Sequence, residues 1–165
     1  MATITTTTTI IIIIAAVYFS PTHAAQNNLA KQFLGPHNVA RAVLGLPPLA
    51  WDARLARYAR NYAQKRRRDC VLVHSDGPYG ENIFWGSGSG WTAAQAVKYW
   101  AAERAWYDYR GNSCAPGQKC GHYTQMVWRD TRRLGCDMVS CFGGRGVFVV
   151  CSYDPPGNYV GERPY

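Results

Sequence analysis

The sequence predicts an α+β protein built as a three-layer α-β-α sandwich around a small antiparallel sheet. Apolar residues recur every three or four positions in two segments, one following Asp52 and one following Thr92, as on the buried face of a helix. Residues 134–140 and 147–153 have strand composition on either side of a glycine-rich hairpin turn at 143–146. Helices before and after such a sheet cover its two faces.

Length and composition indicate one domain with a real core. The chain has 165 residues, of which 47% are apolar and 13% aromatic. The formal net charge of +8 favours weak, salt-screened attraction to anionic cell-wall polymers and membranes. The basic run Lys65–Arg68 stands at the expected C-terminus of the helix that follows Asp52, where the helix dipole favours cations. We therefore interpret it as a solvated helix end and expect no nucleic-acid partner.

The N-terminus predicts a secretory signal peptide over residues 1–24. An apolar run at Ile10–Ala16 extends through Phe19 and precedes a small-residue site at Thr22–Ala25. The run is shorter than the roughly 20 residues that a membrane-spanning helix needs. We expect cleavage after Ala24 or Ala25, which leaves a single secreted domain from residue 25 to residue 165.

Six cysteines in a secreted chain indicate three disulfides and no free thiol. Six cysteines allow 15 pairings, and the sequence alone does not choose among them.

The first helical segment is expected from Asn28 to about Ala42, interrupted at Gly35-Pro36, since proline disfavours a helix interior. His37-Asn38 follows the interruption and is interpreted as a buried, hydrogen-bonded pair that fixes the new helix start. Asp52 and Thr92 are the expected N-caps of the next two helices.

The stretch between these helices predicts a short β-like run and then a lid. Cys70–His74 has strand composition and is followed by a turn at Ser75–Pro78. A Gly/Ser segment at 86–90, bracketed by Phe84, Trp85 and Trp91, is expected to form a mobile lid with apolar edges.

Two side chains, Glu103 and His122, are candidate site residues. Glu103 has only aromatic neighbours at helical spacing and no local cation, so we expect its partner across a cleft. His122 begins a short helical segment, Gly121–Trp128, and shares a helix face with Gln125 and Met126, as on a pocket wall.

The segment 121–131 resembles a signature of the CAP superfamily, which comprises cysteine-rich secretory, venom-allergen and plant pathogenesis-related proteins. Residues 148–159 resemble a second signature of the same superfamily, and shorter matches lie at His37–Arg41 and Gly80–Ile83. The resemblance covers essentially all of the chain after about residue 28 and is strongest to the plant pathogenesis-related class 1 proteins. It implies the CAP fold and the pairing Cys70 with Cys141, Cys114 with Cys120 and Cys136 with Cys151.

The resemblance also places four side chains in the superfamily's central cavity: His74, Glu81, Glu103 and His122. If they meet, the neutral imidazoles of His74 and His122 can bind a divalent metal such as Zn²⁺, with the glutamates orienting them. The alternative is a self-satisfied polar network that fixes the shape of the cavity. No cofactor is required in either interpretation.

The function expected from the resemblance is that of a secreted, monomeric plant defence protein. It would bind sterols or pathogen membrane lipids through Phe84, Trp85 and Trp91 and restrict fungal or oomycete pathogens, in the apoplast or alternatively the vacuole. A weak metal-dependent protease is the enzyme alternative. The chain lacks the His-Glu-x-x-His and Gly-x-Ser-x-Gly motifs, so we expect no enzymatic activity.

The C-terminal tail, residues 155–165, suggests another role. It resembles a signalling peptide released from plant members of the family, although Ser152 replaces an asparagine of that pattern. A cut between Asp154 and Pro155 by a processing protease would free the tail for a receptor, because no cysteine follows Cys151. The alternative is a docked tail in which Tyr159 and Tyr165 cover the core.

Overall fold

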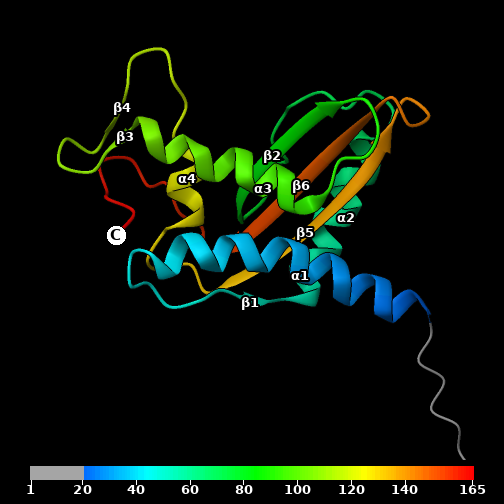
Figure 1. Ribbon diagram of the computed structural model, residues 1–165, viewed down its shortest axis with the longest axis horizontal. Helices are drawn as coiled ribbons and strands as arrows, with labels where there is room; N and C mark the ends of the chain where they lie inside the picture. Colours follow the sequence, from blue (N-terminus) through cyan, green and yellow to red (C-terminus); the bar gives the residue numbers. More distant parts are fainter. Residues whose placement is uncertain (1–20) are drawn as a thin grey trace, which may run out of the picture.

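The structure, a computed structural model, describes residues 21–165, so most of the expected signal peptide lies outside the described residues. The elements in chain order are α1 (Pro21–Ala42), β1 (Ala50–Trp51), α2 (Ala53–Arg66), β2 (Gly80–Ser87), α3 (Ala93–Ala102), the 3₁₀ helix η1 (Glu103–Trp106), β3 (Tyr107–Asp108), β4 (Ser113–Cys114), α4 (Gly121–Met126), β5 (Arg133–Cys141) and β6 (Gly146–Asp154) (Figure 1). Within the described residues, no helix combines the length and apolar character needed to cross a bilayer.

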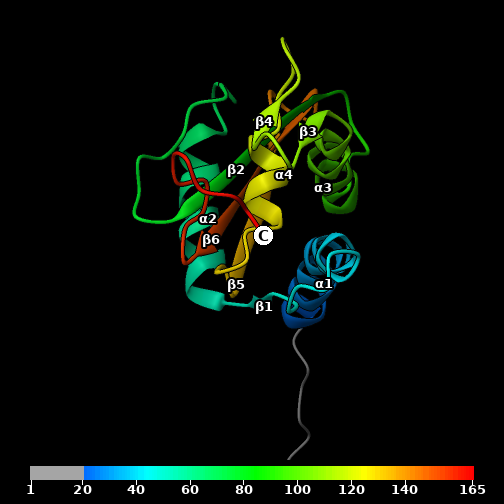
Figure 2. The ribbon, with the colours of Figure 1, turned by 90° about the vertical axis from the view of Figure 1, so that its left-hand side faces the viewer.

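The central sheet has the strand order β1-β5-β6-β2. The strands β5, β6 and β2 pair antiparallel, and the two-residue β1 adds a parallel edge beside β5. Helix α2 covers one face of the sheet, and α1, α3 and α4 cover the other (Figure 2). The predicted α+β sandwich is confirmed.

Strand β6 divides the core into its two layers. Val149 and Tyr153 belong to the cluster shared with α1, α3 and α4, whereas Phe148 and Val150 belong to the cluster beneath α2. This follows from the alternation of side chains along a strand. Every residue of β6 except Asp154 is buried.

The two predicted helix caps are confirmed. Asp52 accepts hydrogen bonds from the backbone N–H groups of Arg54 and Leu55 at the start of α2. Thr92 and Gln95 form a reciprocal capping box at the start of α3.

The predicted interruption of the first helix is wrong, because α1 runs without a break through Gly35 and Pro36. A proline inside a helix costs about 3 kcal/mol. The turns on either side of Pro36 place Phe33 and His37 in the core, where both are fully inaccessible to solvent. Burial of these turns against the sheet offsets the local cost.

Between α2 and α3, the predicted strand at 70–74 is wrong, and the segment expected as a lid at 86–90 is shorter than predicted. The segment 70–74 is a loop, and its apolar side chains find no partner strand. The expected lid begins instead as the regular strand β2, which pairs with β6 along its whole length. Only residues 88–90 remain as a connection between β2 and the approach to α3.

The structure contains the three disulfides that the resemblance implied, Cys70–Cys141, Cys114–Cys120 and Cys136–Cys151, and no free cysteine. Cys136 and Cys151 are directly opposed on β5 and β6. The first disulfide ties the loop after α2 to the end of β5, and the second closes a short loop just before α4. All three therefore fix connections around the sheet or the entry to α4.

A buried guanidinium holds the loop after α1, the end of α4 and the turn that follows α4. Arg41 of α1 is inaccessible to solvent and donates hydrogen bonds to four backbone carbonyls. These carbonyls belong to Pro47, Met126, Trp128 and Thr131. One side chain thus replaces the hydrogen bonds that the end of α4 and the following turn cannot make internally.

His37 joins α1 to the sheet. The predicted hydrogen-bonded pair is confirmed, but only His37 is fully buried, Asn38 is half-buried, and the pair does not mark a helix start. His37 Nδ1 donates to the Phe33 carbonyl at 2.8 Å, which leaves Nε2 to accept a hydrogen bond from the Tyr153 hydroxyl at 2.7 Å. Asn38, the other member, exchanges two hydrogen bonds with the backbone of Leu49. Burial lowers the pKa of His37 to about 4.

The depressed pKa of His37 predicts acid sensitivity. The unfolded chain takes up this proton near pH 6.5, whereas the folded protein resists it until about pH 4. The free energy of unfolding should therefore fall as pH drops through this window, by up to about 3 kcal/mol from this group. Denaturant unfolding of the disulfide-intact protein at several pH values measures the effect.

The variant His37→Gln should show a shallower loss of stability than wild type between these pH values. His74→Gln is the control, since the pKa of His74 is raised and its removal cannot flatten the acid loss. Equal slopes for wild type and His37→Gln would contradict the assignment.

Candidate functional site

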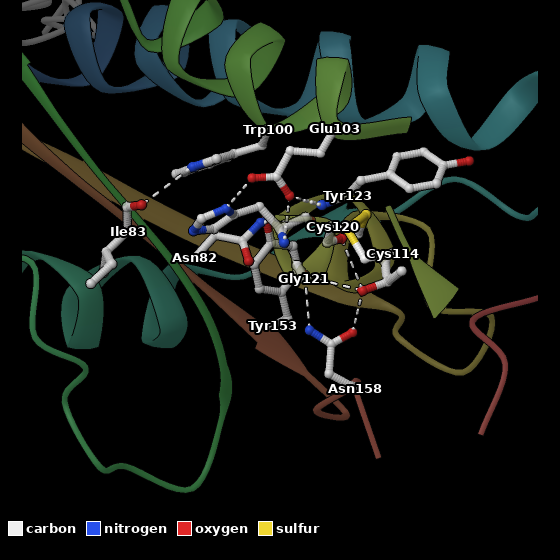
Figure 3. Close-up of polar contacts among 12 residues, drawn as sticks. Asn82, Ile83, Trp100, Glu103, Cys114, Cys120, Gly121, Tyr123, Tyr153 and Asn158 are labelled. Atoms are coloured by element: carbon white, nitrogen blue, oxygen red, sulfur yellow. Dashed lines mark hydrogen bonds and ion pairs between the residues drawn. A yellow bond between two sulfur atoms is a disulfide. The ribbon is translucent and has the colours of Figure 1, made fainter. Parts of the chain in front are cut away.

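Glu103 caps the helix that carries His122. One carboxylate oxygen accepts a hydrogen bond from His122 Nδ1 at 2.6 Å, and the other accepts the backbone N–H groups of His122 and Tyr123 at 3.0 and 3.2 Å (Figure 3). The indole of Trp100 stacks on the His122 ring, with 6.0 Å between centroids. The expected partner of Glu103, distant in sequence, is the N-terminus of α4, which Glu103 contacts directly and not across a cleft.

A second histidine–glutamate pair repeats this arrangement. His74 Nδ1 lies 2.8 Å from Glu81 Oε1, which also accepts the backbone N–H of Ser75 at 3.0 Å. The Glu81 side chain is only 7% exposed, while that of His74 is 57% exposed. The hydrogen bond to Glu81 raises the pKa of His74.

The two pairs meet at one cavity of about 410 Å³. His74, Glu81 and His122 line it, and Glu103 stands behind His122. Each imidazole has its Nδ1 directed to a carboxylate, and no described residue bonds either Nε2. The four residues are thus two oriented imidazoles with their carboxylates, and among the described residues no three His, Cys, Asp or Glu side chains cluster as a metal site.

A buried chain of hydrogen bonds supports His122 from behind. Asn82 of β2 donates from Nδ2 to the His122 carbonyl and to the Tyr153 hydroxyl, both at 3.0 Å (Figure 3). Tyr153 in turn donates to His37. Sequence reasoning assigned no role to Asn82 or Tyr153, since the pattern of a buried strand gives no sign of which polar group it must satisfy.

The expected pocket wall on α4 is only partly present. His122 lines the cavity, but Met126 lies in the core. Gln125 is also buried, and its side-chain oxygen accepts the backbone N–H of Gly157 at 3.0 Å. Gln125 therefore anchors the tail and does not face a ligand.

The aromatic residues expected at the lid separate into two faces. The rings of Phe84 and Trp91 lie 5.0 Å apart, and Tyr99 of α3 completes a cluster with both. Trp85, the next residue along β2, points to the opposite face of the sheet. The predicted set is therefore corrected: Phe84 and Trp91 come together, and Trp85 does not join them.

An apolar groove of about 420 Å³, which sequence reasoning missed, lies beside α1 and α3. It is lined by Pro36, Val39, Ala40, Val43, Lys98, Ala101, Arg104 and Tyr123. Val39 and Val43 are 67% and 62% exposed. Their spacing of four residues on a helix was the available signal, but the expected break at Pro36 obscured the continuous face.

The C-terminal tail is docked on α4 and on the β3–β4 hairpin. Asn158 bonds both Thr124 and the Gly121 carbonyl, and the Pro164 carbonyl accepts the backbone N–H of Arg129 at 2.6 Å. The rings of Tyr165 and Tyr109 stack at 4.7 Å. The tail is more exposed than β6, as expected, and it is docked, but only Tyr165 packs against the core, while Tyr159 is 52% exposed.

Comparison with known proteins gives the family. The model of the "Cysteine-rich secretory protein family" (CAP) matches residues 34–153. Pathogenesis-related protein PR-1 of Medicago truncatula is 60% identical over 134 residues, covering 81% of this chain and 78% of that protein. Pathogenesis-related protein 1A of Nicotiana tabacum is 55% identical over 141 residues, covering 86% and 83%.

Among solved structures, NaASP2 with Zn²⁺ superposes with a TM-score of 0.68 at 31% identity, covering 83% of this chain and 84% of that one. The chain belongs to the CAP family. Within it, the chain is a plant pathogenesis-related protein of class 1, which makes it a plant defence protein.

The cap that Glu103 provides gives a stability prediction. Glu103→Ala leaves three donors on α4 without their acceptor, and hydrogen bonds to a charged group are worth about 1.5–3 kcal/mol each. We expect a loss of about 2–3 kcal/mol in the free energy of unfolding, because water can reach part of the site. Glu103→Gln should lose less, since it keeps one acceptor oxygen.

Glu162→Ala is the control for this measurement. Glu162 is an exposed tail carboxylate, and its removal should change stability by less than about 0.5 kcal/mol. Chemical denaturation at neutral pH compares the variants, and a Glu103→Ala protein as stable as Glu162→Ala would refute the capping role.

Proposed function

We propose that this defence protein is secreted to the apoplast, with the vacuole as the alternative, and binds a sterol or a related lipid as a monomer to restrict fungal or oomycete pathogens. The observation that carries the proposal is the apolar groove beside α1 and α3. Its volume of about 420 Å³ lies within the range of small-molecule pockets, roughly 300–1,000 Å³. Binding of this kind needs no catalytic turnover.

The chemistry of the groove suits a long apolar ligand with one polar end. Val39, Val43 and Ala101 supply an aliphatic wall, and Lys98 and Arg104 are the two cations that border it. Contiguous exposed apolar side chains on a protein surface commonly mark a ligand or membrane contact. The groove is therefore the preferred lipid site, and the Phe84–Trp91–Tyr99 cluster, which does not line the groove, is the alternative.

The two lipid sites are separable by mutation. Val39→Ser with Val43→Ser should weaken binding of a fluorescent sterol, on the order of tenfold, because both side chains lose their apolar contact with the ligand. Trp91→Ala should leave binding unchanged if the groove is the site. Titration of the purified, disulfide-intact protein measures both.

A fluorescent fatty acid tested in parallel shows whether the two cations favour an anionic end group. Loss of sterol binding in Trp91→Ala alone would assign the site to the aromatic cluster. No binding of either probe by wild type would refute the lipid proposal.

A divalent metal at the cavity is a second proposal, favoured by the orientation of the two imidazoles. His74 and His122 would be the ligands through Nε2, while Glu81 and Glu103 hold Nδ1, as carboxylates do behind metal-binding histidines. The donor set suits Zn²⁺, which would act there as a Lewis acid. A hydrolytic use of such a metal remains the less favoured alternative, because this chain has no catalytic motif of its own.

Calorimetry with Zn²⁺ tests the metal proposal. Affinity should fall as pH drops through the raised pKa of His74, since protons compete with the metal for the imidazole. His122→Ala and His74→Ala should each lose most of the binding, whereas Glu162→Gln should not. Equal binding by wild type and both histidine variants would remove the site.

Release of the tail as a signalling peptide is the remaining alternative. The Asp154–Pro155 bond stands at the end of β6, where Asp154 pairs with Arg133 and the Pro155 carbonyl accepts the Thr131 hydroxyl at 2.9 Å. A processing protease therefore meets a docked segment, and release requires the tail to leave α4 first. These contacts favour the intact, docked tail in the unstimulated protein.

A further inference from the structure

The loop after α2 exposes three consecutive apolar side chains. Val71, Leu72 and Val73 are 51%, 51% and 47% exposed. The described part of the chain leaves about half of each side chain uncovered, and the lipid groove, lined by α1 and α3, does not include them. Leaving them in water has a cost that a surface contact would remove.

Cations stand immediately beside these apolar residues. Lys65, Arg67 and Arg68 are exposed and make no ion pair with any described residue, while Arg66 is paired with Asp69 at 3.1 Å. Three uncompensated positive charges therefore flank the apolar loop. The first exposed carboxylate after residues 71–73 in the sequence is Asp76.

The loop is held in shape by its own contacts. The Cys70–Cys141 disulfide fixes its base to β5. The Tyr62 hydroxyl of α2 donates to the Val73 carbonyl, and the backbone N–H of Val73 donates to Val71 at 2.9 Å. Figure 2 shows the connection from α2 to β2 running along the outside of the molecule, beyond the layer of α2. The apolar side chains are thus presented without an ordering step.

We propose that this basic-apolar loop, residues 65–73, docks the protein on an anionic lipid bilayer. Val71, Leu72 and Val73 would enter the boundary between headgroups and acyl chains, and Lys65, Arg67 and Arg68 would contact anionic headgroups. A soluble polyanion such as a uronic-acid polymer would use the cations and leave the apolar side chains in water. The combination of both chemistries favours the bilayer.

Docking in this orientation has a consequence for the cavity of the two histidine–glutamate pairs. Leu72 lines that cavity together with His74 and Lys119. The rim of the cavity would therefore face the membrane surface. The docking itself does not require the groove beside α1 and α3 to hold a lipid.

Vesicle co-sedimentation tests the docking. Wild-type protein should partition to phosphatidylcholine vesicles containing phosphatidylglycerol and much less to pure phosphatidylcholine. Val71→Ser with Leu72→Ser should weaken the partition on the order of tenfold or more at unchanged charge. Arg67→Gln with Arg68→Gln should weaken it by a similar factor, and added salt should reduce this part.

Matched controls separate the loop from general effects. Val160→Ser removes a valine elsewhere that is even more exposed, and Arg54→Gln with Arg57→Gln removes two exposed charges from the other end of α2. Both should bind vesicles nearly as wild type does.

Two results would overturn the proposal: no partition of wild type to anionic vesicles, or a serine variant that binds as wild type while the charge variants do not. The second result would indicate adsorption by charge alone. If polygalacturonate binding were also lost in the charge variants and kept in the serine variant, the partner would be an anionic polymer.

Discussion

The six-residue helix α4 is too short to be stable by itself, and the rest of the site depends on how the fold holds it. Isolated helices shorter than about 12–15 residues are marginal in water. Glu103 accepts the backbone N–H groups of the second and third residues of the helix, His122 and Tyr123. At the other end of the helix, Arg41 donates to the Met126 carbonyl. The Cys114–Cys120 disulfide fixes the entry to the helix. The position of His122 is therefore a tertiary property, set by contacts from α1, η1, β2 and the tail.

The same helix joins the surfaces to which we assign functions. His122 lines the cavity of the two histidine–glutamate pairs, Tyr123 lines the apolar groove, and Thr124 with Gln125 holds the tail. Undocking of the tail would thus remove hydrogen bonds from the helix that orients His122. Tyr153 and Asn82 continue the connection through the sheet to His37 on α1. Such a network of contacts keeps the cavity and the groove in a fixed shape, which suits binding of a ligand without rearrangement of the protein.

Local signals predicted the parts of the structure that local chemistry controls. The caps at Asp52 and Thr92, the hairpin of β5 and β6, and the distant partner of Glu103 followed from residue type and spacing. The disulfide pairing needed the family resemblance, since spacing leaves every pairing open. Prediction failed where tertiary packing overrides local preference, as at Pro36. Strand β2 was missed because it contains Gly80 and Gly86, which depress strand propensity. Packing explains why glycine occupies both positions. A Cβ on Gly80 would lie 2.3 Å from Gln125 Oε1, and one on Gly86 would lie 2.4 Å from the Trp91 ring.

The most direct test of this account is native-state hydrogen exchange of the α4 amides. If contacts from the whole fold hold the helix, the amides of Thr124, Val127 and Trp128, which all donate within α4 or its final turn, should exchange only through global unfolding. Their protection should then match that of the central strand β6. Exchange of these amides at rates typical of an isolated short helix, while β6 stays protected, would contradict the account.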